Sequence, residues 1–330
     1  MAESGRLQVG QVLAKERFLV AQADLRKDRY GSSYYNLILN GKGGEPISGK
    51  IWSQNLTKNL SPGDFVEVYA EVESFMDNLQ LSIRRYQVLE PGSVDISQYV
   101  RSAEIDTQTA FDELFNPSED DCRNPYLREL LKAFHANPTF SKLFREVPAA
   151  TYHHHNYLGG LVEHTYELRE LAEQLLVIYG DYVDRDLLLT AIALHDAGKV
   201  HSYAVNAGVP GMSDTGRLLD HLFIGASMIS NQWDALAKEK EWPASATVLK
   251  HKLLHIVLSH HGRHDWGSPV LPQTLEAVLV HLCDHMNANM KAALDCVGKM
   301  QPGDAWSEKV DILEAKRSFF RPTEQPDKET

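Results

Sequence analysis

The 330-residue sequence has only three cysteines, Cys122, Cys283 and Cys296, and no two of them form a C-x-x-C pair. Three cysteines cannot all pair with one another, so we expect reduced thiols in a reducing compartment. No uninterrupted apolar stretch approaches the ~20 residues that a membrane-spanning helix needs. The polar start MAESGRLQVG contains no apolar signal-peptide core. These features predict a cytoplasmic protein without membrane association.

The chain also has no excess of basic residues. It carries 33 Lys+Arg against 45 Asp+Glu, a formal net charge of -12. A protein this acidic does not bind polyanions through bulk electrostatics. Residues 1–90 contain 11 basic and 11 acidic residues, so the whole net negative charge lies in residues 91–330. Any nucleic-acid contact therefore needs a local basic patch or metal ions. The neutral N-terminal part repels an anion less than the rest of the chain does.

Short runs rich in branched and aromatic residues occupy residues 7 to about 90, separated by Gly, Asn, Pro and Asp. In DFVEVYAEV, the apolar residues Val66, Val68 and Val72 alternate with polar ones, which is typical of a half-buried strand. The segment 76–78 (Met-Asp-Asn) suits a tight hairpin turn. About five strands in about 85 residues indicate a small closed barrel such as an OB-fold.

Helical periodicity dominates the rest of the chain, and 330 residues favour more than one domain. We predict a multidomain α and β protein, with an N-terminal OB-fold β-barrel followed by an all-α helical bundle. The expected boundaries are residues 1–92 for the barrel, 93–150 for a helical connector, 151–315 for the bundle and 316–330 for a frayed tail.

Five segments of the helical part place a histidine or aspartate on an otherwise apolar helix face. They are GGLVEHT, ALHDAGK, LLDHL, LSHHG and VHLCDHM, which give the order His, His-Asp, His, His-His, Asp. Gly198 is positioned to end the helix that carries the doublet. A single histidine in such a place is more often a hydrogen-bonded core residue. Buried carboxylates among histidines, however, call for a compensating cation, so we predict a metal site formed by His164, His195, Asp196, His221, His260 and Asp284.

The second histidine of the His-His pair is a weaker candidate ligand. Adjacent helical residues point about 100° apart, so His260 and His261 cannot both face one ion equally. The other histidines, among them His153 and His281, stay with the core interpretation.

With these motifs, the chain resembles the HD-domain metal-dependent phosphohydrolases, whose binuclear members carry the same ordered ligand set. More narrowly, HHNYLGGLVEHT, GRLLDHLFIG, LSHHGRHDWGSPVLPQTLEA and the preceding barrel resemble the YhaM-type 3′→5′ exoribonucleases. Those proteins pair an N-terminal OB-fold with a C-terminal HD domain. The resemblance implies that residues 1–92 bind nucleic acid and that residues 151–315 form an HD phosphohydrolase domain.

The resemblance also implies roles for individual residues. His164, His195, Asp196 and Asp284 would hold a first divalent ion, and Asp196 would bridge to a second ion held by His221 and His260. Catalysis would involve Asp196, Lys199 as the cation facing a substrate phosphate, and His261 beside the substrate or an ion. Mn²⁺ is the ion that the resemblance favours, and a His-rich site with a bridging carboxylate also suits Fe, Co or Zn better than Mg.

The barrel would hold single-stranded RNA by stacking bases on aromatic rings, with basic side chains along the backbone. The candidates are Tyr35, Trp52, Phe75 and Arg84, and the wider set includes Tyr34, Tyr86, Lys50, Lys58 and Arg85. Tyr34 and Tyr35 are adjacent on a predicted strand, so one ring should point inward and the other outward.

The predicted function is metal-dependent 3′-to-5′ exoribonuclease activity that releases 5′-mononucleotides from single-stranded RNA. One alternative is an HD nucleotidase or cyclic-nucleotide phosphodiesterase, although a mononucleotide substrate needs no strand-holding domain. The other is a non-catalytic RNA-binding protein, although such a protein has no need of a complete ligand set. Single-stranded DNA as a substrate and a homo-oligomeric assembly stay open.

Overall fold

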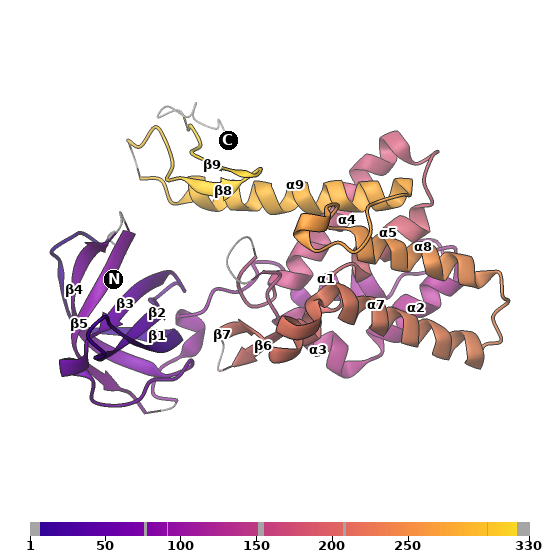
Figure 1. Ribbon diagram of the computed structural model, residues 1–330. Helices are drawn as coiled ribbons and strands as arrows, with labels where there is room; N and C mark the ends of the chain where they lie inside the picture. The colour runs from indigo at the N-terminus through magenta and orange to yellow at the C-terminus, as the bar shows by residue number, and fades with distance from the viewer. Residues whose placement is uncertain are drawn as a thin grey trace. The chain divides into compact units, whose positions relative to one another are not determined.

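The computed structural model of the 330-residue chain describes residues 7–75, 78–90, 92–150, 155–206, 209–301 and 303–321 (Figure 1). It divides into two compact units. One comprises Met1–Ser102 with Val205–Gly211, and the other comprises Ala103–Ala204 with Met212–Thr330. Two residues of the predicted hairpin turn, 76 and 77, and His153 lie outside the described residues. Among the described helices, none combines the length and the apolarity that crossing a bilayer requires.

The first unit is a closed five-stranded barrel, as the sequence predicts. Its strands follow the order β1-β2-β3-β5-β4 around the barrel. All neighbouring strands are antiparallel except β3 and β5, which are parallel. The strands are β1 (Val12–Lys27), β2 (Ser33–Asn40), β3 (Pro46–Ile51), β4 (Phe65–Phe75) and β5 (Asn78–Val88).

Alternation along the strands fills the barrel interior. Val66, Val68, Ala70 and Val72 of β4 are all buried, whereas the residues between them are half-buried. This period of two follows from the opposite directions of successive side chains in a strand. The inward side chains form one apolar cluster with those of the other strands, among them Leu37, Leu39, Ile51, Leu81 and Ile83.

The second unit is mainly helical. Its helices are α1 (Thr107–Phe115), α2 (Pro125–His135), α3 (Pro138–Glu146), α4 (Gly160–Tyr179), α5 (Arg185–Leu194), α6 (Lys199–Ser202), α7 (Asp214–Glu239), α8 (Ala246–Ser259) and α9 (Leu275–Gly298). Asp106, Asn124 and Asn137 cap the first three helices, because each side chain accepts backbone N–H groups of the first turn. Helices α4, α5, α8 and α9, which carry or adjoin most of the predicted ligands, pack against one another.

Two small sheets distinguish the described residues from the expected all-α arrangement. One consists of β6 (Tyr203–Asn206) and β7 (Val209–Met212), and the other is a hairpin of β8 (Val310–Ile312) and β9 (Ala315–Arg317). The β8–β9 hairpin and a bridge between Trp306 and Phe320 give regular structure to residues expected to begin the frayed tail. Strands of three or four residues are too short for a periodic pattern to reveal them.

Candidate metal centre

Asp196 lies at the centre of the predicted ligands, and it is 2% exposed. Its Oδ2 lies 3.2 Å from His195 Nε2 and 3.8 Å from His164 Nε2. Its Oδ1 lies 3.4 Å from His221 Nε2 and 3.7 Å from His260 Nε2. The two oxygens of one carboxylate therefore face two different pairs of imidazoles.

Asp284 of helix α9 lies on the same side of the cluster as Oδ2 of Asp196. Its Oδ1 lies 3.2 Å from His164 Nε2. His195, His260 and Asp284 also have potential ligand atoms within 4.8 Å of one another, as do His164, His195 and Asp196. All six residues predicted to bind metal thus meet in one place, although they come from segments up to 120 residues apart.

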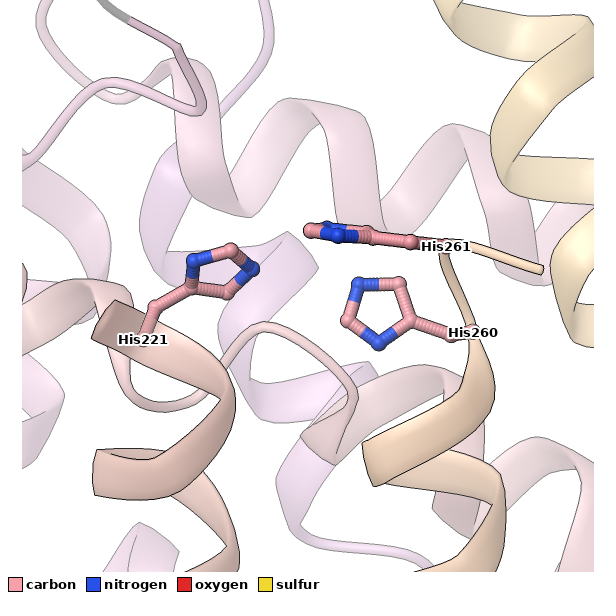
Figure 2. Close-up of side chains that lie close together, drawn as sticks. All are labelled: His221, His260 and His261. Atoms are coloured by element: carbon pink, nitrogen blue, oxygen red, sulfur yellow. The ribbon is translucent and has the colours of Figure 1, made fainter. Parts of the chain in front are cut away.

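His261 belongs to the cluster as well. The potential ligand atoms of His221, His260 and His261 lie within 4.8 Å of one another. Figure 2 shows their rings turned toward one another from two chain segments, although His260 and His261 are adjacent in sequence. The two rings can converge because α8 ends at Ser259: His260 is its C-cap, and His261 lies in the turn that follows. The sequence-based expectation that these two side chains diverge assumed that the helix continues through both residues.

Five histidines of this cluster share one hydrogen-bonding pattern. In each, Nδ1 donates to an oxygen acceptor 2.7–2.9 Å away, and this leaves the Nε2 lone pair for another partner. Such anchoring fixes the tautomer and the ring orientation of histidines that bind metals. The pairs are His164 with Asn287 Oδ1, His195 with Ile192 O, His221 with Asp220 Oδ1, His260 with Val257 O and His261 with Trp266 O.

Three buried atoms of the cluster have no hydrogen-bond partner among the described residues. They are His195 Nε2, Asp196 Oδ1 and His221 Nε2. A buried polar atom without a partner costs free energy, about 1–3 kcal/mol when the group is desolvated. Because these atoms point into the cluster from different sides, the donor set fits divalent cations.

The ends of two helices add to the electrostatic preference for cations. His195 is the C-cap of α5, and His260 is the C-cap of α8. The carboxyl end of a helix carries the negative end of its dipole. Both helices therefore end at the cluster with the polarity that stabilises a positive charge.

The protonation equilibria favour the metal-binding forms of several ligands. Burial lowers the pKa of His164, His260 and His261, which keeps these imidazoles neutral. Burial disfavours the charged form of Asp196, but neighbouring positive charge, above all that of Lys199, outweighs it and holds the pKa of Asp196 well below its usual range. A neutral imidazole and an ionised carboxylate are the forms that bind a metal ion.

Lys199 lies beside the cluster, as the HD-x-x-K arrangement implies. Its Nζ is 2.6 Å from Asp196 Oδ2, and its side chain is 13% exposed. Burial disfavours the ammonium form, yet the charge of Asp196 outweighs burial and raises the pKa of Lys199. Lys199 therefore stays charged at the edge of the cluster.

Two residues that position the histidines escaped the sequence analysis. Asp220 interrupts α7 with φ 61° and ψ 153°, and its carboxylate accepts from His221 Nδ1 and from the N–H of Leu222. A non-glycine residue in this conformation stores strain of order 1–3 kcal/mol. In the sequence, the position of Asp220 directly before His221 was the one indication of this role.

The other is Asn287, which is 8% exposed and lies three residues after Asp284 on α9. Its Oδ1 accepts from His164 Nδ1, and its Nδ2 donates to Glu167 Oε2 at 2.7 Å. Both carboxamide ends are therefore engaged, which fixes the orientation of the side chain. The i, i+3 spacing from Asp284 was the only signal in the sequence.

Gly198 has a different role from the one predicted. Helix α5 already ends at Leu194, and Gly198 has a right-handed backbone conformation with φ −66°. The absent side chain matters instead, because a Cβ at Gly198 would collide with the carbonyl oxygen of His221 and the nitrogen of Gly225. This close approach brings α7, and with it His221, next to Asp196.

We therefore expect Gly198→Ala to destabilise the helical unit by about 1–3 kcal/mol, the usual cost of overpacking. The added methyl group must push α7 away from the 196–199 turn, so affinity for divalent ions should fall as well. Thermal unfolding and metal titration measure the two effects. Gly211→Ala is the matched control, because a Cβ there meets nothing within 4 Å; equal behaviour of the two variants would contradict the packing argument.

In the barrel, the structure corrects one predicted RNA contact. Tyr35 is 6% exposed and belongs to the barrel core, where its hydroxyl accepts from the N–H of Leu60. Its ring cannot stack on a base. Tyr34 takes the outward position, 5.2 Å from Trp52 between ring centroids, so the predicted division between the two tyrosines is confirmed.

Trp52 and Phe75 are exposed by 37% and 54%, as a stacking surface requires. Lys50 lies between them, with Nζ 5.7 Å from the Trp52 ring centroid and 4.6 Å from that of Phe75. Arg84 is exposed and pairs with Glu71 at 3.2 Å. Tyr86, by contrast, is buried and bonded through its hydroxyl to the backbone at Lys58. Tyr34, Lys50, Trp52 and Phe75, here called the aromatic platform, thus gather on one side of the barrel.

The cluster and its helices define a class of protein. Residues 161–289 match the HD domain family, and this range holds all six predicted ligands. HD domains are metal-dependent phosphohydrolase domains, so the chain requires divalent metal ions. It is an enzyme that hydrolyses phosphodiester bonds.

Similarity extends beyond that domain. The chain is 31% identical over 306 residues to the 3′-5′ exoribonuclease YhaM of Shouchella clausii (strain KSM-K16), covering 88% of this chain and 87% of the relative. It is 29% identical over 296 residues to the 3′-5′ exoribonuclease YhaM of Bacillus pumilus (strain SAFR-032), covering 89% and 90%. The chain therefore belongs to the YhaM 3′-5′ exoribonuclease family. No solved structure matches it significantly.

Proposed function

We propose that this enzyme degrades single-stranded RNA from the 3′ end and releases 5′-mononucleotides at a pair of divalent ions. The observation that carries the proposal is the shared orientation of four histidines, His164, His195, His221 and His260, whose Nδ1 atoms are anchored while their Nε2 atoms surround Asp196. The names of the relatives support RNA as the substrate and the 3′-to-5′ polarity.

The proposed ligands divide between the two oxygens of Asp196. His164, His195, Asp284 and Oδ2 of Asp196 would hold one ion, and His221, His260 and Oδ1 of Asp196 would hold the other. The distances of 3.2–3.8 Å between the carboxylate and these imidazoles support a shared carboxylate. Mn²⁺ is the proposed ion, since mixed nitrogen and carboxylate donors suit it better than Mg²⁺.

When bound, such ions lower the pKa of a coordinated water and stabilise the charge on a phosphoryl group. The protein contributes orientation and a second positive charge. Lys199, held beside Asp196, is placed to face a non-bridging phosphate oxygen, where a preorganised cation stabilises the transition state. His261 is proposed to contact the substrate or the second ion.

The experiment that tests this function compares substrates. Purified protein loaded with Mn²⁺ is incubated separately with single-stranded RNA, cyclic mononucleotides and nucleoside monophosphates, and the products are identified by chromatography. We expect 5′-mononucleotides from RNA and no turnover of the small nucleotides. Turnover of the small nucleotides alone would contradict the proposal and favour a nucleotidase or cyclic-nucleotide phosphodiesterase.

The aromatic platform is the proposed RNA-holding surface. Stacking contributes about 1–3 kcal/mol per base, and Trp52 is only partly exposed, so we expect Trp52→Ala to weaken RNA binding about tenfold. Hydrolysis of a p-nitrophenyl phosphodiester, which needs no strand contact, should not change. Fluorescence anisotropy with labelled RNA measures the affinity. Trp306→Ala, at an exposed tryptophan of the other unit, is the control; an equal loss in both variants would exclude the platform.

A further inference from the structure

Helix α9 has an outward face that is entirely apolar. Of its 24 residues, all of which the structure describes, the exposed ones are six large apolar residues and the terminal Gly298. A surface helix normally turns polar residues to solvent, and a helix that is apolar all round is normally buried. The six, here called the α9 stripe, are Leu275 (57% exposed), Val278 (41%), Leu282 (52%), Met286 (42%), Met290 (55%) and Leu294 (59%).

The stripe lies opposite the metal centre on the same helix. After Leu275 its members recur at spacings of three and then four residues, so they form a continuous row along the helix. Asp284 stands midway along the row in sequence but points into the cluster, where it contacts His164. The other sides of α9 pack against α4, α5, α8 and strand β8, and Figure 1 shows the β8–β9 hairpin beside α9. Packing within this unit therefore leaves the stripe uncovered.

The stripe is nearly symmetric about its own midpoint. Leu282 and Met286 are equally distant from position 284, and so are Val278 and Met290. Leu275 and Leu294 are nearly equidistant from position 284 as well, since their separations from it differ by one residue. A second α9 running antiparallel across the first would place each member against its symmetry mate, which is the self-complementarity that a two-fold interface requires. Rows with a spacing of four residues pack on one another at a crossing angle of about 50°.

We propose that the α9 stripe is the interface of a homodimer, in which two copies of the chain pack α9 against α9 in antiparallel orientation. The absence of an exposed charge on this face favours a second copy over a charged partner such as RNA. At 1.5 Å per residue and a width of about 10 Å, the helix offers a patch of roughly 360 Å² in projection. A stable interface buries about 800 Å² per partner, so α9 alone supplies less than half of it, and the surface beside α9, including the exposed Val270 and Leu271, must supply the rest.

The dimer has a consequence for the enzyme. The two-fold axis would cross α9 at the level of Asp284, so each copy would brace the helix that carries this carboxylate in its partner. This inference does not depend on the substrate or on the polarity of hydrolysis.

Light scattering during size-exclusion chromatography tests the proposal with the full chain. We expect wild-type protein at twice the chain mass of 37.1 kDa. Val278→Lys and Met290→Glu each place a charge in the interface, and each should give a monomer with unchanged helix content by circular dichroism. Val177→Lys, at an 83% exposed apolar position on α4, is the matched control and should remain a dimer. Leu294→Glu replaces Met290→Glu as the disruptive variant if the latter fails to fold.

Mixing the two variants tests the antiparallel register itself. In a mixed dimer, Lys at position 278 of one copy meets Glu at position 290 of the other, while the second symmetry-related pair stays apolar. We therefore expect an equimolar mixture to recover the dimer. A monomeric wild type would overturn the proposal. A dimer insensitive to both variants, or monomeric variants that fail to combine, would overturn the location or the antiparallel geometry.

Discussion

Replacing Asp196 with asparagine is expected to lower the rate of RNA hydrolysis by about 10³-fold or more. Metal ions contribute several kcal/mol to transition-state stabilisation, and each 1.36 kcal/mol corresponds to a factor of ten in rate. The substitution keeps the size of the side chain but removes the charge that faces four imidazoles. It also leaves Lys199 without its partner 2.6 Å away. Both proposed ions should be lost, because each shares this carboxylate.

Metal analysis and steady-state kinetics on the same preparation measure both effects. Asp112→Asn is the matched control, since Asp112 also pairs with a histidine, His135, at 2.7 Å, but lies outside the cluster. The control should retain full metal content and activity. An Asp196→Asn protein that keeps two ions and hydrolyses RNA at the normal rate would rule out the bridging role.

Replacing Asn287 with alanine is expected to weaken metal affinity by about 10- to 100-fold, the usual effect of losing a hydrogen bond that orients a metal-binding histidine. The variant removes the acceptor that holds His164 Nδ1 at 2.9 Å. The imidazole of His164 could then rotate and present the wrong nitrogen. Activity should return at high Mn²⁺ concentration, because the ligands themselves remain.

Calorimetric titration with Mn²⁺ measures this affinity directly. Asn289→Ala provides the comparison on the same helix, since Asn289 bonds to the backbone of Leu313 and His285 rather than to a proposed ligand. We expect its Mn²⁺ affinity to equal that of the wild type. An unchanged affinity in Asn287→Ala would show that His164 is held in place without this bond.

Much of the fold follows from local patterns in the sequence. The alternation in β4 predicted a strand with one buried side, and the structure buries Val66, Val68 and Val72. The inward faces of five helical segments predicted that distant histidines and aspartates meet, and they do so around Asp196. These predictions were feasible because burial and periodicity are properties of a single segment.

Other features depend on how separate segments meet. Asn287 bonds to His164 across 123 positions of the chain, and the need for Gly198 arises only when α7 packs against the 196–199 turn. The pattern alone could not decide which of Tyr34 and Tyr35 faces the barrel interior, because a shift of one residue in strand register exchanges the two sides. The strained backbone at Asp220 has no signature in composition or periodicity.

The most direct test of the account is a time course with 5′-labelled single-stranded RNA and chelator-stripped protein, with and without added Mn²⁺. We predict a ladder of labelled fragments that shortens from the 3′ end with Mn²⁺, and intact RNA without metal or with Asp196→Asn. Immediate release of labelled mononucleotide would show attack from the 5′ end. Undiminished cleavage by the stripped protein or by Asp196→Asn would contradict the claim that RNA is hydrolysed at the Asp196 metal centre.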